Sequence, residues 1–227
     1  MSQCMRSEEM KVVEIFRSIE GEGKRAGLPC TFIRLYGCNL DCKYCDSTYA
    51  TKEEQYVVMS IPDILEAVKS YEIPNVTVTG GEPLIHNGID NLLSALIDAR
   101  YNINVETNGS VIPRIQNAKN GKIFYTMDFK TNASGMSSYM NLEAIKKLHQ
   151  KDVLKFVVGS LEDMDQCLEV LDTFHDCEDF PQVYFSPVWG QIEPKDIVDY
   201  LLSHRLYNCK VQLQLHKIIW DPDMRGV

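Results

Sequence analysis

Short β-rich segments alternate with amphipathic helical patterns along the chain, and this alternation limits the possible fold more than any other feature. Strands and helices that alternate with short connections predict a mostly parallel sheet whose outer face is covered by helices. The predicted strands are residues 11–16, 30–36, 75–79, 103–106, 123–128, 153–158, 183–186 and 211–215, and the predicted helices are residues 62–70, 89–99, 142–149, 164–174 and 194–203.

Length and charge narrow the possibilities further. With 227 residues, 44% of them hydrophobic, we expect a single domain over residues 1–227 with a flexible lead-in at residues 1–9. The opening residues lack an apolar signal-peptide core and no segment is apolar for long enough to span a bilayer, so we expect a cytoplasmic protein with no membrane partner. A net charge of −9 without a basic stripe argues against a nucleic-acid partner.

Three of the eight cysteines lie within one short segment, GCNLDCKYCD. Cys38, Cys42 and Cys45 follow the second predicted strand, at the carboxyl edge where parallel sheets bind ligands. Thiolates suit zinc or an iron–sulfur cluster, and a closed zinc site would need a fourth ligand such as Cys30 or a distant His. Three thiolates on a four-iron cluster instead leave one iron open to the amino and carboxylate groups of S-adenosylmethionine (SAM).

The C-x3-C-x2-C spacing resembles the radical SAM superfamily, whose cofactors are a 4Fe-4S cluster and SAM. The Gly-Gly-Glu-Pro segment at residues 80–83 resembles a superfamily segment in which Gly81 approaches SAM and Glu82 accepts from its ammonium group. Tyr44 stands where the superfamily carries an aromatic residue near the adenine, and simple packing of the loop is the alternative. These features predict a SAM site beside the three cysteines.

Longer segments resemble one family of this superfamily, the 7-carboxy-7-deazaguanine synthases. They are EIFRSIEGEGKRAGLPCTFIRLYGCNLDCKYCDS, VTVTGGEP, VETNGS and LQLHKIIWDPDMRGV, in the family's order over essentially the whole chain. The resemblance implies an α/β fold that is a modified, shortened radical SAM partial barrel. It implies a lyase of queuosine biosynthesis that converts 6-carboxytetrahydropterin to 7-carboxy-7-deazaguanine with loss of ammonia. It also implies catalytic use of SAM, a need for Mg²⁺, a homodimer, and an electron donor such as flavodoxin or ferredoxin.

The resemblance also implies which residues meet the substrate. Ile19, Glu20 and Gly21 match a segment that contacts the pterin, although the family usually has Gln at position 20, and an ionised carboxylate only accepts hydrogen bonds. Arg34 matches the residue that binds the substrate carboxylate, for which its planar fork is suited, and a structural ion pair is the alternative. The other substrate candidates are Glu22, Thr79, His216 and the terminal carboxylate of Val227.

Candidates for SAM and magnesium complete the implied site. Ser47 matches the family's Mg²⁺-binding Ser or Thr, since magnesium takes few protein ligands and keeps several waters. Asp128 stands where many family members have Ser, a second departure. Besides Gly81, Glu82 and Tyr44, the implied SAM contacts are Cys45, Asp46, Glu106, Asp128, Phe129, Lys130, Ser186, Pro187, Val188 and Trp189.

Two alternative functions share parts of this pattern. A glycyl-radical activating enzyme has a similar length and the same cysteine spacing, but it acts on a partner protein and does not need the EGEG segment. A non-catalytic iron–sulfur or zinc module needs no SAM, and it leaves the segment at residues 80–83 without a role.

Overall fold

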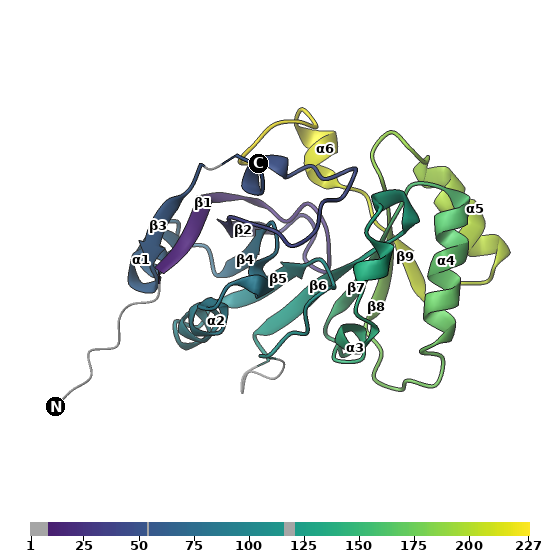
Figure 1. Cartoon of the computed structure of the whole chain (residues 1–227), viewed down its shortest axis with the longest axis horizontal. Coiled ribbons are helices and arrows are strands. Elements are labelled where there is room, and N and C mark those ends of the chain that lie inside the picture. The colour runs from purple at the N-terminus through teal and green to yellow at the C-terminus, as the bar shows by residue number, and fades with distance from the viewer. Residues whose placement is uncertain (1–8, 54, 116–120) are drawn as a thin grey trace.

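A nine-stranded sheet forms the centre of the computed structural model, which describes residues 9–53, 55–115 and 121–227 (Figure 1). The strand order is β3-β1-β2-β4-β5-β6-β7-β8-β9. The two strands β1 (Glu9–Ile19) and β3 (Val57–Ser60) are antiparallel and form one edge. The parallel strands are β2 (Pro29–Leu35), β4 (Asn75–Gly80), β5 (Asn102–Thr107), β6 (Ile123–Lys130), β7 (Val153–Val158), β8 (Gln182–Pro187) and β9 (Cys209–Val211). The predicted α/β fold with a mostly parallel sheet is therefore confirmed.

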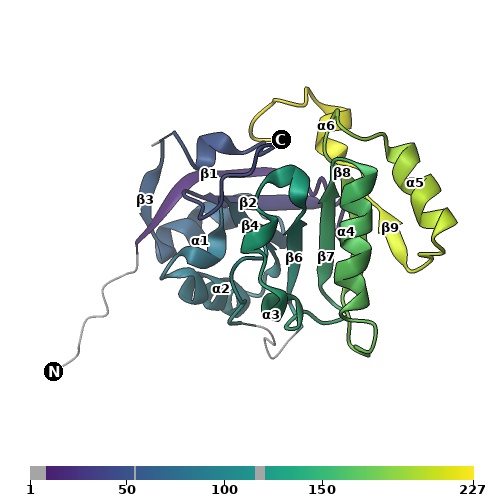
Figure 2. The same ribbon diagram turned by 45° about the vertical axis from the view of Figure 1, so that its right-hand side comes forward.

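Five helices lie along the outer side of the curved sheet, as Figures 1 and 2 show. The first begins with a capping box, in which the Ser60 side chain accepts from the Asp63 backbone and the Asp63 side chain accepts from the Ser60 backbone. Pro62 is the second residue of this helix, within the first turn, where the backbone N–H has no partner inside the helix. The helices are α1 (Ile61–Lys69), α2 (Ile89–Asp98), α3 (Leu142–Ile145), α4 (Leu161–Asp172) and α5 (Pro194–Ser203).

The structure corrects two of the expected elements and adds one strand that was not expected. The strand predicted at residues 211–215 is wrong, because pairing with β8 ends at Val211 and the chain then turns into helix α6 (Leu215–Ile219). Only the first part of the helix predicted at residues 142–149 is helical, as α3, and the residues after it form non-helical turns. The sequence did not predict β3, a short and largely exposed edge strand. Of the predicted lead-in, Glu9 belongs to β1, and residues 1–8 lie outside the described part of the chain.

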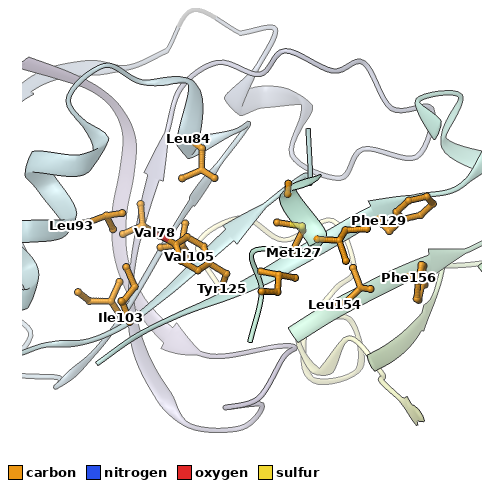
Figure 3. Close-up of a cluster of buried hydrophobic side chains, with 14 of the residues drawn as sticks. Val78, Leu84, Leu93, Ile103, Val105, Tyr125, Met127, Phe129, Leu154 and Phe156 are labelled. Atoms are coloured by element: carbon orange, nitrogen blue, oxygen red, sulfur yellow. The ribbon is translucent and has the colours of Figure 1, made fainter. Parts of the chain in front are cut away.

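Alternation along the strands separates an apolar face from a polar one. On β5 and β6 the apolar residues alternate with polar ones and pack into the core toward the helices, where Figure 3 shows Ile103, Val105, Tyr125 and Met127 together. On each strand, the residues that alternate with these core residues point to the inner, concave side of the sheet. This set is mostly polar: Arg34, Thr77, Thr79, Asn104, Glu106, Thr126, Asp128, Lys130, Lys155 and Ser186. In the described part of the chain, no helix is long and apolar enough to cross a bilayer.

Candidate active site

The three-cysteine loop follows β2 and lies against the end of β4. Gly81 donates to the Leu35 carbonyl (3.2 Å) and Glu82 donates to the Gly37 carbonyl (2.9 Å), which holds the start of the loop beside the Gly-Gly segment. A side chain on Gly81 would place its Cβ 2.2 Å from the Gly37 carbonyl oxygen, so only glycine fits this close approach. The close approach of Gly81 to Gly37 therefore holds the start of the cysteine loop against the end of β4.

The thiols of Cys38, Cys42 and Cys45 are free and partly buried. The Cys38 sulfur accepts from the Leu40 backbone (3.4 Å) and faces the Asn108 amide (3.6 Å). Burial, reinforced by the other two thiols, raises the pKa of Cys42, so a bound metal must displace protons from this loop.

The described side chains do not form a ready-made site for a single metal ion. Among residues 9–53, 55–115 and 121–227, no three His, Cys, Asp or Glu side chains are grouped closely enough to hold one metal ion. A structural zinc ion needs four ligands converging on one point, whereas a four-iron cluster takes each thiolate on a different iron. Three thiols spread around one loop therefore fit a cluster.

Glu82 has a different environment from the one predicted for a SAM contact. Its side chain is fully buried, and it accepts from the Asn108 backbone (2.6 Å), the Leu84 backbone (2.9 Å) and the Thr107 hydroxyl (2.9 Å). Burial outweighs these hydrogen bonds and raises the pKa of Glu82 to about 7. This geometry makes Glu82 an internal tie between the ends of β4 and β5, and its carboxylate does not offer the predicted ammonium contact.

We expect Glu82→Gln to lower the melting temperature by about 2 to 8 °C, corresponding to about 1–2 kcal/mol, because its amide NH₂ would face a backbone donor. Since the folded state raises the pKa of Glu82, the stability that this carboxyl contributes is full below its ordinary pKa and falls as pH rises toward 7. The deficit of the variant should therefore be larger at pH 5 than at pH 8. Thermal unfolding followed by circular dichroism at both pH values measures it. A deficit that grows between pH 5 and pH 8 would contradict the prediction.

Arg34 projects from β2 into the concave side and is held by an acidic partner. Its Nε donates to Glu14 Oε1 at 2.8 Å, and that oxygen also accepts from the Tyr49 hydroxyl at 2.9 Å. The Arg34 Nη1 lies 3.5 Å from the Ser47 hydroxyl, which donates to Asp46 Oδ1 at 3.0 Å. The ion pair with Glu14 uses the Nε of the guanidinium, and the outer nitrogen Nη1 faces Ser47.

Glu20 and Glu22 lie on the same loop but have separate partners. Glu20 is 1% exposed and pairs with Arg25 at 2.6 Å, and its carboxylate also accepts from Thr77 and from Asn104. Such a buried ion pair satisfies the charge of Glu20 inside the protein, so this side chain is not presented to a ligand. Glu22 is only partly buried, and its partner on the concave side is Lys155.

A network of charged side chains crosses the concave side from Glu22 to Lys130. Lys155 on β7 pairs with Glu22 Oε2 at 2.7 Å and with Asp128 Oδ1 at 2.9 Å. Lys130 pairs with Asp128 Oδ2 at 2.8 Å, and Ser186 donates to Glu22 Oε1 at 3.0 Å. Burial alone would raise the pKa of Asp128, but Lys130 and Lys155 outweigh it and hold that pKa below its ordinary value. The candidates from β6 and β8 therefore meet in one network.

Glu106 lies among these groups without an ion pair of its own in the described part of the chain. Burial, then the charge of Glu20, raises the pKa of Glu106 to about 7, against the opposing effects of Lys155 and the Thr79 hydroxyl. Burial opposes the charge of Arg34, but Tyr49, Glu14 and then Glu106 outweigh it and raise the pKa of Arg34, so Arg34 and Glu106 face the same space. Glu106 and Thr79 therefore accompany Arg34 on the concave side, as their positions on neighbouring strands predict.

The remaining SAM candidates surround the ends of β6 to β8. The Tyr44 hydroxyl donates to the Val157 carbonyl at 3.4 Å, which attaches the cysteine loop to β7, and burial raises the pKa of Tyr44 to about 12. Phe129 differs from its neighbours, because it is 4% exposed and packs on Phe156 in the core. At the end of β8, Ser186, Pro187 and Val188 are buried and Trp189 is 52% exposed.

The C-terminal segment returns to the substrate side of the site. His216 begins α6 and packs so closely on Gly21 that a Cβ there would lie 2.2 Å from its Nδ1. Burial lowers the pKa of His216. Arg225 pairs with Glu53 (3.1 Å) and lies over the Tyr49 ring, 4.2 Å from its centroid. Val227 is half-buried at the end of this segment, where Figure 1 places the C-terminus near the cysteine loop.

Four residues of this site were missed by sequence reasoning: Glu14, Arg25, Tyr49 and Lys155. Lys155 carried a signal, because it interrupts the apolar strand VLKFVV at a position whose neighbours Leu154 and Phe156 face the core. A lysine of that parity must lie on the inner side of the sheet. The other three have no such signal, since each depends on a partner elsewhere in the chain.

A polar concave face beneath a loop of three thiols defines the class of this protein as a radical SAM enzyme. The model of the radical SAM superfamily matches residues 32–174, which span the cysteine loop and the strands β6 and β7 of the network. A 7-carboxy-7-deazaguanine synthase of Clostridium acetobutylicum is 44% identical over 220 residues, covering 96% of this chain and 99% of the relative. One from Chlorobaculum tepidum is 37% identical, covering 96% of this chain and 97% of the relative. The chain belongs to the 7-carboxy-7-deazaguanine synthase family.

The solved structures agree on the fold. The crystal structure of QueE from Escherichia coli superposes with a TM-score of 0.75 at 21% identity, covering 91% of this chain and 94% of that one. This likeness confirms the expected radical SAM partial barrel. The cofactors of the superfamily are a 4Fe-4S cluster and SAM, and the thiol arrangement fits the former. Both of these relatives are named as synthases. Neither is named as a glycyl-radical activating enzyme or as a non-catalytic module.

Proposed function

We propose that this chain converts 6-carboxytetrahydropterin to 7-carboxy-7-deazaguanine with release of ammonia, on the concave side of its sheet. The observation that carries the proposal is the placement of Arg34, whose guanidinium is held by Glu14 through Nε and reaches toward Ser47, beside the cysteine loop, with Nη1. A planar, doubly donating fork at this place suits a substrate carboxylate. The pterin ring would then extend over Thr79 and Glu106 toward Glu22 and His216.

The protein's contribution to the reaction is mainly positioning. When bound, the cluster and SAM supply a 5′-deoxyadenosyl radical for hydrogen abstraction from the pterin. Cys38, Cys42 and Cys45 would hold the cluster, and the buried tie at Glu82 keeps their loop on the sheet. Asp128 and Lys130, with the segment from Ser186 to Trp189, would hold SAM. Fixed in this way, the reacting atoms meet in a site that excludes water.

The assembly and partners of the chain are part of the proposal. We expect one domain and a homodimer, and helix α6 carries two strongly exposed apolar residues, Ile218 (57%) and Ile219 (55%), that suit burial against a second copy. The seven described cysteines are all free, which suits the reducing cytoplasm. The reductant that the radical chemistry requires would be a flavodoxin or a ferredoxin.

Anaerobic turnover tests the proposed function. The reconstituted protein, given SAM, Mg²⁺, a reductant and 6-carboxytetrahydropterin, should form a product with the ultraviolet spectrum of 7-carboxy-7-deazaguanine. The SAM should be used catalytically, so product should exceed the SAM supplied. Cleavage of SAM without any deazaguanine would leave the chain a radical SAM enzyme but would overturn the proposed substrate.

We expect Ser47→Ala to abolish the response of turnover to added Mg²⁺. Ser47 offers a hydroxyl beside the Asp46 carboxylate, and hard oxygen donors of this kind suit magnesium together with the substrate carboxylate and water. Cluster content and SAM binding should stay normal, because the loop keeps its backbone contacts. Titration of Mg²⁺ in the turnover assay measures the response.

Two controls accompany this prediction. Ser47→Thr should keep most of the Mg²⁺ response, since it retains the hydroxyl, and Ser70→Ala, an exposed serine at the end of α1, should keep all of it. If Ser47→Ala is stimulated as strongly as the wild type, the metal lies elsewhere and Ser47 is only a loop residue.

A further inference from the structure

A single buried ammonium group connects the two halves of the candidate site. Lys155 is 6% exposed, and its Nζ contacts Glu22 Oε2 at 2.7 Å and Asp128 Oδ1 at 2.9 Å. Burial opposes its charge, but Asp128 and then Glu22 outweigh that effect and raise the pKa of Lys155 well above its ordinary value. The side chain therefore remains a cation with two anionic partners.

The two partners of Lys155 come from different places in the chain. Glu22 lies in the loop after β1, where its second oxygen accepts from Ser186. Asp128 lies on β6 directly beside Lys155 in the parallel register, and its second oxygen pairs with Lys130. In the proposed function Glu22 faces the pterin and Asp128 faces SAM. One ammonium thus fixes a carboxylate on each side.

We propose that Lys155 is a positioning residue that couples binding of the pterin to binding of SAM, by holding Glu22 and Asp128 together. The ligand that binds first restricts the motion of its own carboxylate and, through the shared ammonium, that of the other one as well. The second ligand then finds its carboxylate already in place and loses less conformational entropy on binding. This inference rests on the proposed function for the identity of the two ligands.

Stability does not explain a lysine at this position. The residues next to it on β7 are the core residues Leu154 and Phe156, and a buried ion pair is commonly no more stabilising than apolar side chains of similar size. A buried ammonium has three N–H donors to satisfy, and here both of its ion pairs are with carboxylates, one from the loop after β1 and one from β6. Two short contacts to carboxylates from separate elements point instead to control of their relative position.

The test measures how much the pterin changes SAM affinity. The dissociation constant of SAM is measured anaerobically by isothermal titration calorimetry on the reconstituted protein, with and without saturating 6-carboxytetrahydropterin. We expect the pterin to tighten SAM binding at least about fivefold in the wild type. In Lys155→Met this ratio should fall to about one, and in Lys155→Arg it should be partly restored. The matched control is Lys210→Met, which should keep the full ratio. Lys210 is an exposed lysine on β9, separated from β7 by β8, and its partners are Gln182 and Tyr184.

The outcomes separate this inference from the proposed function. A Lys155→Met protein that melts at a lower temperature but keeps the wild-type ratio would show that Lys155 is only structural. A wild type that turns over the pterin with no coupling would also overturn the inference. A wild type that neither binds nor converts the pterin would overturn the proposed function, and this inference with it. If Lys155→Met does not fold, the double variant Lys155→Met/Glu22→Gln, which removes one cation and one anion together, replaces it with the same expected loss of coupling.

Discussion

Replacing Cys38, Cys42 or Cys45 with alanine is expected to abolish the iron–sulfur cluster and all turnover. Each thiolate binds a different iron, and no spare cysteine lies within the loop to take its place. The wild type reconstituted anaerobically should contain about four irons per chain, with an electron paramagnetic resonance signal that SAM perturbs. Iron and sulfide content and this signal measure the loss.

The other cysteines provide matched controls. Cys177 is exposed and Cys209 is partly buried, both far along the chain from the loop, and their alanine variants should keep the full cluster. Cys167→Ala should also keep it, although that residue is buried in the core and its loss should reduce stability. Stoichiometric zinc in anaerobically purified wild type, with no cluster after reconstitution, would contradict the assignment.

The second large effect is expected at Arg34. Arg34→Ala should raise the KM for the pterin by about 10- to 150-fold, because a charge-assisted pair with a carboxylate contributes about 1.5–3 kcal/mol. SAM affinity should stay nearly intact, since the hydrogen bonds of Arg34 go to Glu14 and Ser47, and neither residue is a SAM candidate. Steady-state kinetics and calorimetry measure the two constants.

Two further variants distinguish a ligand-binding Arg34 from a structural one. Arg34→Lys should recover only part of the affinity, because a point charge does not reproduce the planar fork. Glu14→Gln removes the internal ion pair but leaves the guanidinium, so its effect on KM should be smaller than that of Arg34→Ala. If SAM and substrate affinities fall together in Arg34→Ala, the arginine holds the fold and not the pterin.

The two departures from the family pattern have internal partners here. Glu20, which stands where the family usually has Gln, pairs with Arg25, whose guanidinium lies over the Phe124 ring at 5.0 Å. Asp128, which stands where many members have Ser, pairs with Lys130 and Lys155. Each added carboxylate is thus balanced by a cation, as a partly buried charge requires.

Some of this molecule was predictable from the sequence because it depends on residues near one another in the chain. The cysteine spacing is local and indicated the radical SAM class, and the helix predicted at residues 62–70 lies within one residue of α1 at each end. Strand parity depends only on alternation, so the placement of Arg34 and Glu106 on the inner side also followed. The last predicted strand, VQLQL at residues 211–215, alternates as a strand should, but it was wrong because pairing with β8 ends at Val211 and helix α6 begins at Leu215.

The tertiary structure alone decided which charges meet. Lys155 and Glu22 are 133 residues apart in the chain, and their contact follows from the sheet register and the path of the loop after β1. The tertiary structure also distinguishes two carboxylates near the ends of parallel strands. Glu82, after β4, is fully buried and acts as an internal tie, whereas Glu106, near the end of β5, faces the site. A single sequence does not encode such pairings in any local pattern, because an ion pair depends on distance in space and not on separation along the chain.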